Sequence, residues 1–432
     1  MQQVNLGIIG GGTVGGGVFD ALRLNGSLVA SRLGVTVTVK RVAVRDLKKK
    51  RCANIPAKLL TTDWRAVVND PQVNLIAELI GGTTTAREVV LAALKLGKPV
   101  VTANKALLSA HGEELFAAAK KFQTNLYYEA SVAGGIPIIK ALREGFVGNR
   151  ITHLYGIVNG TCNYILTRMK REGVDFAAVL ADAQRLGYAE TPPDLDIDGH
   201  DAAHKTGILA SIAHGFWVKP KNVFVEGIRF ISQADIQIAD QLGYTIKLLG
   251  IVKCAVAGVQ VSVYPAFVPN AHVLASVNDV FNAVFVRGDI VGDTLFYGRG
   301  AGKNATASAV LSDIGDAALD LKFGTKHRLP PFVPHACDGA VLPMDKVVSR
   351  YYVRLNVADR PGTLAKIAAI FGAANIGISS VIQPESHEAS NVPLIFMIHD
   401  AQNGALQKAL AKIRKLPVVK SAPVMIRVES FE

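Results

Sequence analysis

The chain has 432 residues, of which 50% are hydrophobic and 19% are charged. This composition excludes a disordered protein and a coiled-coil rod, and at about 150 residues per domain the length suggests two or three domains. Lysine and arginine outnumber aspartate and glutamate by 47 to 35, which gives a formal net charge of +12. The basic residues are scattered apart from clusters at 48–51 and 412–415. We therefore expect a protein that handles small anionic molecules, with no nucleic-acid partner.

The sequence gives no signal for secretion or for membrane insertion. Its first residues, MQQVNLGIIGGGTVGGGV, lack the basic region and cleavage site of a signal peptide. No apolar run reaches the roughly 18 to 20 residues that cross a bilayer. The cysteines are far apart and form no C-x-x-C pair, and they are Cys52, Cys162, Cys254 and Cys337. We expect reduced thiols in a cytoplasmic protein that does not bind membranes.

In the first part of the chain, predicted strands alternate with predicted helices. Apolar runs predict strands at 4–9, 35–44, 75–80, 99–102 and 124–128. Helical periodicity predicts helices at 14–28, 86–96 and 111–122. This alternation is typical of a Rossmann fold, a doubly wound parallel sheet.

The pattern changes after residue 129. We expect a strand at 151–158 and then helices at 161–172, 175–186 and 201–215. Longer strands between 223 and 295 indicate a second sheet of mixed or antiparallel type. A glycine loop at 298–302 opens a further helix that runs to about Leu321. These elements predict a central α+β domain.

The C-terminal part predicts a compact unit after a proline-rich linker. Its strands are expected at 351–357, 376–382, 394–398 and 424–428, and its helices at 363–374 and 405–416. The order β-α-β-β-α-β is ferredoxin-like. The predicted fold class is α/β, with boundaries at 1–130 (dinucleotide-binding), 131–326 (substrate-binding, catalytic and dimerisation), 327–349 (linker) and 350–432. We expect the helix at 300–322 to pack back on the first domain.

The glycine-rich segment GGGTVG follows the first strand and opens a helix, as a dinucleotide-binding turn does. Gly10 permits the turn, Gly12 lets the backbone approach a pyrophosphate, and Gly15 lets the helix pack on the strand. The second strand ends in Arg45 and Asp46, which are followed by a lysine run. The planar fork of an arginine suits a 2′-phosphate and favours NADP, whereas Asp46 keeps NAD possible.

The densest polar cluster runs from Tyr188 to Lys205. Asp201 and Lys205 are four residues apart and share a helix face, where a lysine beside a carboxylate can donate a proton to a developing alkoxide. The alternative is a surface ion pair, but the residues at 207–210 predict burial. Two metal patterns overlap this segment. A calcium loop is rejected because Lys205 stands where a glutamate is needed, and a zinc site at His200 and His204 lacks the expected neighbouring glutamate.

Several motifs occur together in order, and with them the chain resembles monofunctional homoserine dehydrogenase with a C-terminal ACT domain. The motifs are IGGGTVGGGV, ELIGG, VTANK, EASVAGGIP, NGTCNYIL, the segment from Tyr188 to Lys205, GRGAG and ATASAV. The resemblance implies an enzyme that interconverts L-aspartate 4-semialdehyde and L-homoserine with NAD(P)H, in the route to threonine, methionine and isoleucine. The chain departs from the usual family pattern at Pro192, before Pro193, and at Ala305, where a proline is common.

The resemblance also implies roles for individual residues. The catalytic residues are Lys205, as proton donor, and Asp201, which orients it. The substrate-binding residues are Glu190, which holds the amino group, with Asp196, Tyr188 and Thr161. The cofactor-binding residues are Gly10, Gly12, Thr13, Val14, Gly15, Arg45, Lys105 and Gly302. A monovalent cation, usually sodium, is held by the side chain of Glu129 and the carbonyls of Val132, Gly134 and Ile136.

The terminal segments around Asp359, Gly362, Asn375 and Ile376 resemble the ligand-binding loops of an ACT domain. The resemblance implies a homodimer or homotetramer that L-threonine inhibits through this domain. The alternative is a dimerisation module that binds no ligand. Two other functions stay open: another Rossmann amino-acid or semialdehyde dehydrogenase, and a non-catalytic sensor of NADP and amino acids.

Overall fold

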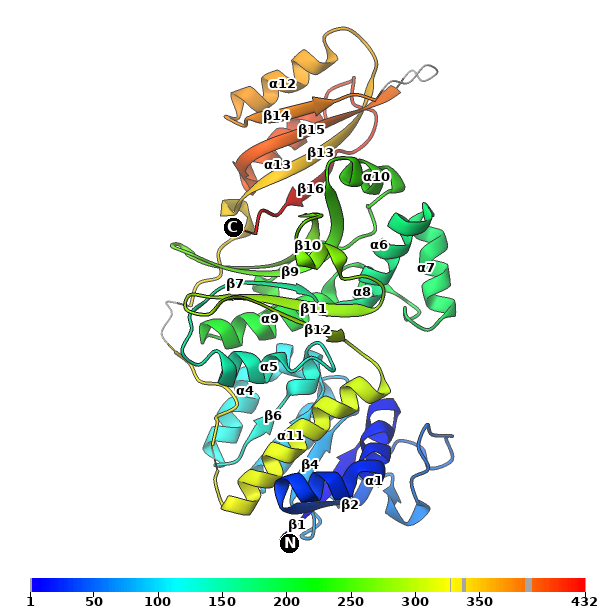
Figure 1. The fold of residues 1–432 in the computed structure, drawn as a ribbon, viewed down its shortest axis with the longest axis vertical. Helices are drawn as coiled ribbons and strands as arrows, with labels where there is room; N and C mark the ends of the chain where they lie inside the picture. Colours follow the sequence, from blue (N-terminus) through cyan, green and yellow to red (C-terminus); the bar gives the residue numbers. More distant parts are fainter. Residues whose placement is uncertain (1, 327, 336–338, 385–390, 432) are drawn as a thin grey trace. The chain divides into compact units, whose positions relative to one another are not determined.

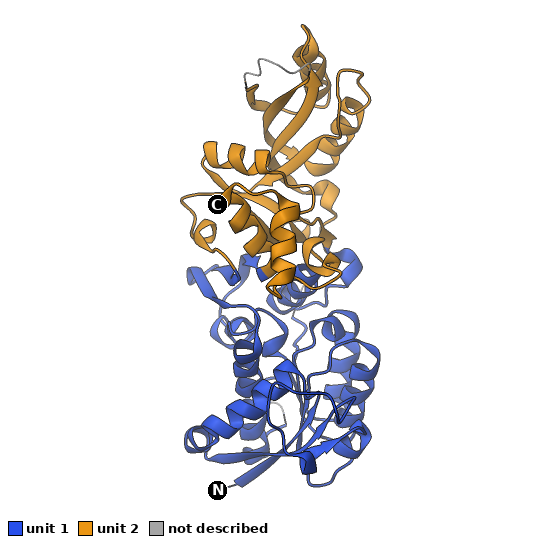
Figure 2. Cartoon of the chain, turned by 90° about the vertical axis from the view of Figure 1, so that its right-hand side faces the viewer, with its two compact units in different colours: residues 1–160, 201–223, 280–339 blue, residues 161–200, 224–279, 340–432 orange. Residues whose placement is uncertain are grey.

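The computed structural model describes residues 2–326, 328–335, 339–384 and 391–431. Cys337, and His327 at the start of the predicted linker, lie outside these residues. The chain divides into two compact units, coloured in Figure 2. Unit 1 comprises residues 1–160, 201–223 and 280–339, and unit 2 comprises residues 161–200, 224–279 and 340–432.

Unit 1 contains a six-stranded parallel sheet in the order β3-β2-β1-β4-β5-β6 (Figure 1). Its strands are β1 (Gln2–Ile9), β2 (Val35–Ala43), β3 (Leu60–Thr61), β4 (Leu75–Glu78), β5 (Val100–Thr102) and β6 (Leu126–Tyr127). Its helices are α1 (Thr13–Leu33), α2 (Trp64–Val68), α3 (Thr84–Lys95) and α4 (Lys105–Lys121). The order reverses between β1 and β4, as in a Rossmann fold, so the predicted fold class is confirmed.

Two boundaries in this sheet differ from the prediction. Helix α4 begins at Lys105, six residues before the predicted start, because the Oδ1 atom of Asn104 accepts the N–H of Leu107 at 3.1 Å and caps the first turn. Strand β6 has only two residues, where five were predicted. The short elements α2 and β3 were not predicted.

Helix α11 (Lys303–Phe323) packs against α1 although some 270 residues separate them in the sequence. Val18 of α1 shares a hydrophobic core with Ala307 and Val310 of α11. A Cβ atom on Gly17 would lie 2.9 Å from the carbonyl oxygen of Lys303, so the two helices touch at a residue without a side chain. Unit 1 also contains α5 (Ile138–Lys140), most of α9 (His200–His214), and an antiparallel set in the order β12 (Gly292–Arg299), β11 (Phe281–Gly288), β7 (Ile151–Ile157).

Unit 2 combines the predicted helices and long strands with the C-terminal ferredoxin-like part. The first set is α6 (Gly160–Glu172), α7 (Phe176–Arg185), α8 (Asp194–Ile197), β8 (Phe224–Val225), α10 (Gln233–Gln241), β9 (Tyr244–Ala255) and β10 (Gly258–Pro269). The second set is β13 (Val348–Ala358), α12 (Thr363–Ala373), β14 (Ile378–Ile382), β15 (Asn391–Gln402), α13 (Asn403–Ile413) and β16 (Val424–Val428). Strand order β16-β13-β15-β14 confirms the ferredoxin-like prediction.

The two sets of unit 2 form one sheet, because β16 pairs in parallel with β10. Helix α10 lies in a stretch where only strands were predicted. Its start is set by a capping box, in which Ser232 and Asp235 bond reciprocally to each other's backbone N–H groups. Among the helices of the described residues, none is long and apolar enough to span a membrane.

Candidate active site

The glycine-rich turn between β1 and α1 has the geometry of a dinucleotide cradle. Gly10 has a φ of +112°, and a Cβ atom there would lie 2.5 Å from the carbonyl oxygen of Leu79. A Cβ atom on Gly15 would lie 1.8 Å from the carbonyl oxygen of Gly10, so this glycine lets α1 pack on the turn. Gly12 faces open space at the start of α1, whose first turn carries no acidic residue. The first turn, with Thr13 and Val14, therefore fits a pyrophosphate.

Arg45 is exposed two residues after the end of β2. The loop that follows it folds on itself: the Asp46 carboxylate accepts the N–H of Lys48 at 2.7 Å, and Arg51 donates to the carbonyls of Asp46 and Leu47. Gly302, with a φ of +114°, precedes the first residue of α11. Lys303 donates to Asp20 of α1 at 2.7 Å, so α11 begins beside the helix that bears the cradle.

The predicted pair Asp201 and Lys205 lies on one buried face of α9. The Lys205 Nζ atom donates to the Oδ2 atom of Asp201 at 2.7 Å and to the carbonyl oxygen of Val158 at 2.7 Å. Their side chains are only 11% and 10% exposed, which rules out a solvated surface ion pair. The predicted burial of residues 207–210 is confirmed, since all four are buried.

Asp201 is held as an anion by its neighbours. Asn159 donates to its Oδ2 atom at 2.9 Å, and the Lys105 Nζ atom lies 2.8 Å from its Oδ1 atom. Burial by itself would raise the pKa of Asp201, but the charges of Lys205 and Lys105 outweigh burial and hold the pKa below its usual range. The pair therefore consists of the Lys205 ammonium and an Asp201 carboxylate that its neighbours hold in place.

Lys105 reaches this pair from the sheet of unit 1. It is the first residue of α4, after the end of β5, and its side chain is 40% exposed. Asn104 ties the same turn to the loop after β4, because its Nδ2 atom donates to the carbonyl oxygen of Gly82 at 2.7 Å. Lys105 thus stands at the carboxyl end of an internal strand of the parallel sheet, the edge at which ligands bind in doubly wound folds.

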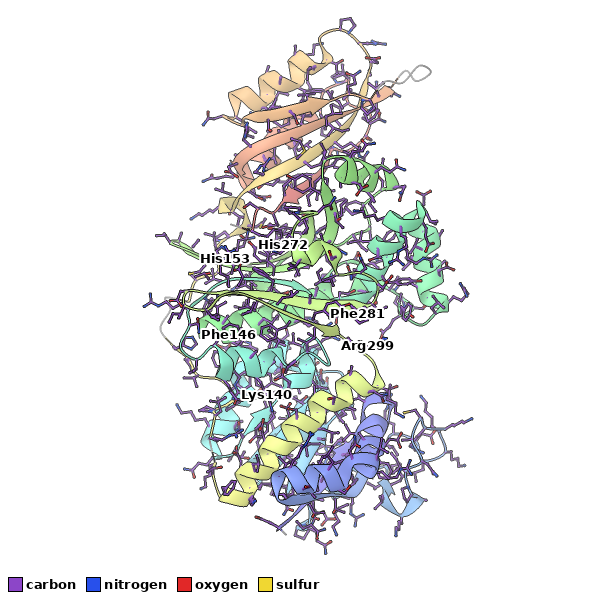
Figure 3. The ribbon with its side chains drawn as sticks, in the orientation of Figure 1. Lys140, Phe146, His153, His272, Phe281 and Arg299 are labelled. Atoms are coloured by element: carbon purple, nitrogen blue, oxygen red, sulfur yellow. The ribbon has the colours of Figure 1, made fainter. Side chains whose placement is uncertain are left out.

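Glu129 lies before α5, at the start of a short buried 3₁₀-helix. Its carboxylate accepts the backbone N–H groups of Ile139 at 2.9 Å and Lys140 at 2.8 Å, and burial raises its pKa to about 7. A Cβ atom on Gly134, which has a φ of +48°, would lie 2.5 Å from the carbonyl oxygen of Gly300. Figure 3 labels Arg299, whose carbonyl oxygen accepts the N–H of Gly135 at 3.0 Å. A cation beside the Glu129 carboxylate would offset the free-energy cost of burying its negative charge.

Val132 and Ile136, which the resemblance also assigns to the cation, are buried in the same loop. The carbonyl oxygen of Ile136 accepts the N–H of Ile138 at 2.8 Å. A second buried carboxylate, that of Asp313 on α11, accepts the backbone N–H of Glu129 at 2.8 Å. Burial raises the pKa of Asp313 well above its usual value. These two buried carboxylates, one in this loop and one on α11, offer the oxygen ligands that a hard cation prefers.

The predicted substrate residues lie in unit 2. Thr161, on α6, donates to the carbonyl oxygen of Tyr188 at 2.6 Å, and the ring of Tyr188 meets that of Tyr164 edge-on at 5.0 Å. Asp196, on α8, is half-buried and accepts the thiol of Cys162 at its carbonyl oxygen. The side chain of Glu190 is exposed. The structure brings Thr161, Tyr188 and Asp196 to one end of α6.

The predicted regulatory residues lie in two loops next to α12. Gly362, with a φ of +83°, precedes the helix, and Asn375, with a φ of +55°, follows it. Asp359 is exposed directly after β13 and accepts a 3.4 Å hydrogen bond from Gln383. Ile376 is buried. Gly362 before α12 and Asn375 after it both adopt the left-handed backbone conformation, which fixes the turns of the two loops.

Two contributors to the site were not identified from the sequence. Asn159 entered only as the first residue of the motif NGTCNYIL, without a role of its own, yet its amide holds Asp201. The carbonyl of Val158 carries no side-chain signal, although it accepts from Lys205. Their position directly after β7, beside the polar segment NGTCNY, is the only sequence feature that points to them.

The geometry agrees with comparisons to known proteins. Residues 137–314 match the family described as homoserine dehydrogenase, residues 10–129 match its NAD-binding domain, and residues 351–418 match the ACT domain. The homoserine dehydrogenase of Pseudomonas aeruginosa is 43% identical over 100% of both chains, and that of Neisseria gonorrhoeae is 42% identical over 100% of both. The crystal structure of a homoserine dehydrogenase from Thiobacillus denitrificans is 44% identical, covers 99% of both chains and has a TM-score of 0.94.

These relatives match the whole chain, including the glycine cradle, the segment with Asp201 and Lys205, and the C-terminal part. The nicotinamide cofactor follows from the matched NAD-binding domain. The chain therefore belongs to the homoserine dehydrogenase family of NAD(P)-dependent oxidoreductases and carries an ACT domain.

Proposed function

We propose that the enzyme reduces L-aspartate 4-semialdehyde reversibly to L-homoserine, a step on the route to threonine, methionine and isoleucine. The single observation that carries this proposal is the buried Asp201–Lys205 pair with Lys105 at 2.8 Å, in a chain of this family. Purified enzyme should oxidise NADPH in the presence of the semialdehyde. Failure to do so, with activity on another amino-acid aldehyde, would assign a different substrate.

Reduction of an aldehyde needs a hydride at carbon and a proton at oxygen. A bound reduced nicotinamide supplies the hydride. Lys205 supplies the proton and stabilises negative charge on the oxygen. Asp201 holds the ammonium in place, and Asn159 and Lys105 hold Asp201. Oxidation of the alcohol reverses these steps, with Lys205 receiving the proton.

Substrate selection is assigned to the segment that leads into α9. Glu190 binds the amino group of the substrate, so that an amino acid is preferred over a simple aldehyde. Asp196, Tyr188 and Thr161 complete the proposed site. The hydrogen bond from Thr161 to the carbonyl of Tyr188 supports this grouping, because it holds these two residues together. Replacement of Glu190 by glutamine should raise KM for the semialdehyde more than it lowers kcat.

NADP(H) is the preferred cofactor in this proposal, and NAD(H) is also accepted. Arg45 is exposed after β2 and precedes a lysine-rich loop, which favours a 2′-phosphate. One related solved structure is described as a hyperthermophilic archaeal homoserine dehydrogenase in complex with NADPH, and it is 28% identical with a TM-score of 0.63. Arg45→Ala should lower kcat/KM for NADPH more than for NADH. Equal losses for the two cofactors would remove Arg45 from this role.

A monovalent cation, sodium, is proposed at the loop of Glu129, with the carbonyls of Val132, Gly134 and Ile136 as further ligands. The donor chemistry supports it, since a buried carboxylate lies next to a second buried acid, that of Asp313. Replacing sodium by a bulky organic cation should lower thermal stability. The matched control is Glu129→Gln, whose stability should not respond to the exchange.

L-Threonine is proposed as an inhibitor that binds the ACT loops at Asp359, Gly362, Asn375 and Ile376. Truncation before β13 is a poor test, because it removes Arg354, the partner of the buried Asp235. Asp359→Ala is sharper, and Asp400→Ala, at an exposed aspartate of β15, is its control. The ratio of rates with and without threonine should rise towards one only in Asp359→Ala. Unchanged inhibition would favour a module that serves dimerisation alone.

We also propose a cytoplasmic homodimer or homotetramer. Strand β12 is an edge strand, and Leu295 and Tyr297 on it are exposed, which supports pairing with a second copy. Sedimentation of the wild type and of Leu295→Lys tests this assignment. A monomeric wild type would contradict it.

A further inference from the structure

Unit 2 contains a cavity of about 440 Å³ that opens to the surface and is lined mostly by residues with polar or charged side chains. It lies between α6, the start of β9, the end of β10 and the segment at 273–279. Three cationic side chains line it, those of Lys170, Arg171 and Lys247. No role proposed above uses this cavity.

Two asparagine side chains that line the cavity, Asn270 and Asn278, are oriented by hydrogen bonds. Lys170 donates to the hydroxyl of Thr245 at 2.8 Å, so that hydroxyl must donate its own hydrogen to the Oδ1 atom of Asn270 at 2.6 Å. Lys247 donates to the Oδ1 atom of Asn278 at 3.2 Å. The amide oxygens of Asn270 and Asn278 are therefore occupied as acceptors. Each amide keeps its NH₂ group as a donor, and within the described residues neither NH₂ group has a hydrogen-bond acceptor.

Lys247 brings a positive charge to the floor of the cavity. It is 1% exposed, and its ammonium donates to the carbonyl oxygen of Val277, to Asn163 at 3.2 Å and to Asn278, all of them neutral acceptors. Burial, together with the charge of Lys170 and against that of Asp279, lowers its pKa to about 7. A buried ammonium among neutral oxygens is stabilised by an anion nearby.

The acidic residues near the cavity do not neutralise the positive charge of the side chains that line it. Asp240 pairs with Lys170 at 2.7 Å but is 57% exposed, and Asp279 reaches Arg171 at 3.4 Å and is 41% exposed. Exposed ion pairs of this kind contribute little to stability and are readily exchanged for another partner. Neither acid lines the cavity, so its wall presents cationic groups and hydrogen-bond donors without a carboxylate among them.

We propose that this cavity binds the oxyanion group of a small metabolite, a phosphate ester or a carboxylate, between Lys170, Arg171 and Lys247. The two amide NH₂ groups orient the oxygens, and the cations balance the charge. The volume matches small-molecule sites, which span about 300 to 1,000 Å³. The site is separate from the residues assigned to substrate, cofactor, cation and threonine.

The test uses the full chain saturated with NADPH, so that the glycine cradle is occupied. Inorganic phosphate and succinate are titrated separately at constant ionic strength, with calorimetry and the melting temperature as readouts. We expect saturable binding of at least one of them, with stabilisation that follows mass action. The tighter of the two identifies the chemical class, phosphate or carboxylate.

The double variant Lys170→Gln/Arg171→Gln should weaken this binding by at least about 10-fold, because two charge-assisted contacts are lost. Lys408→Gln/Lys412→Gln, on an exposed face of α13 in the same unit, removes the same charge and should bind as the wild type does. The proposal is overturned if neither anion binds the wild type up to about 20 mM, where stabilisation would show for any millimolar site. It is also overturned if the Lys170/Arg171 variant binds as tightly as the wild type.

Discussion

The ACT part of unit 2 is joined to its central part through the buried Asp235, whose removal should destabilise the protein strongly. Asp235 is fully buried in the capping box of α10. Its oxygens accept two hydrogen bonds from Arg354 of β13, at 2.7 and 2.9 Å, and one from the hydroxyl of Tyr352 at 3.0 Å. Asp235→Asn keeps the shape but loses the charge that Arg354 needs.

Breaking a buried pair by removing one partner costs about 3 to 5 kcal/mol. We therefore expect Asp235→Asn and Arg354→Met each to lower the free energy of unfolding of unit 2 by that amount. The double variant should cost less than the sum of the two, because it leaves no unpaired buried charge. Asp293→Asn, which breaks the exposed pair with Arg287, should cost less than about 1 kcal/mol.

The pH dependence has a definite sign. Burial by itself would raise the pKa of Asp235, but the hydrogen bonds and charge of Arg354 lower it below its usual value. The stabilisation is therefore fully present above about pH 4, the range where an unfolded aspartate is ionised, and is lost as the pH falls through the folded value. Urea denaturation of all four variants between pH 3 and 7 measures it. Additive losses, or losses below about 1 kcal/mol for the single variants, would refute the reasoning.

Two further predictions concern the site. Gly15→Ala should destabilise unit 1, because its Cβ atom would lie 1.8 Å from a backbone oxygen, whereas Gly12→Ala should melt as the wild type does and bind NADPH less tightly. The pair of variants is compared by melting temperature and by fluorescence titration with NADPH, and equal effects on both would contradict the assignment of Gly12. Asp201→Asn should lower turnover at pH 7 by at least about 10-fold, because Lys205 loses its fixed counter-charge. Wild-type turnover in steady-state assays would contradict it.

Much of the fold could be predicted because its signals are local. Hydrophobic periodicity and glycine spacing were enough for the parallel sheet, the long helices of unit 2 and the ferredoxin-like order. Helix starts were less predictable, since Asn104 and Ser232 act through hydrogen bonds that an apolar pattern does not register. The spacing of Ser232 and Asp235 is that of a capping box, a signal that is separate from the apolar pattern.

The site was predictable where one element carries it. Asp201 and Lys205 are four residues apart on one helix, so their spacing predicted their contact. The contacts of Asn159 and Lys105 with Asp201 join residues more than 40 positions apart and depend on the tertiary fold. The same holds for the cavity at Lys247, because the fold brings this residue of β9 to the cations of α6 and no motif in the sequence links them.

The central claim, that Lys205 transfers the proton, is tested most directly by Lys205→Ala. Turnover of aspartate semialdehyde and NADPH affinity are measured together, with Lys95→Ala at an exposed position of α3 as the control. We predict a fall in turnover of at least about 100-fold with NADPH binding almost unchanged. Near-normal turnover in Lys205→Ala would contradict the account.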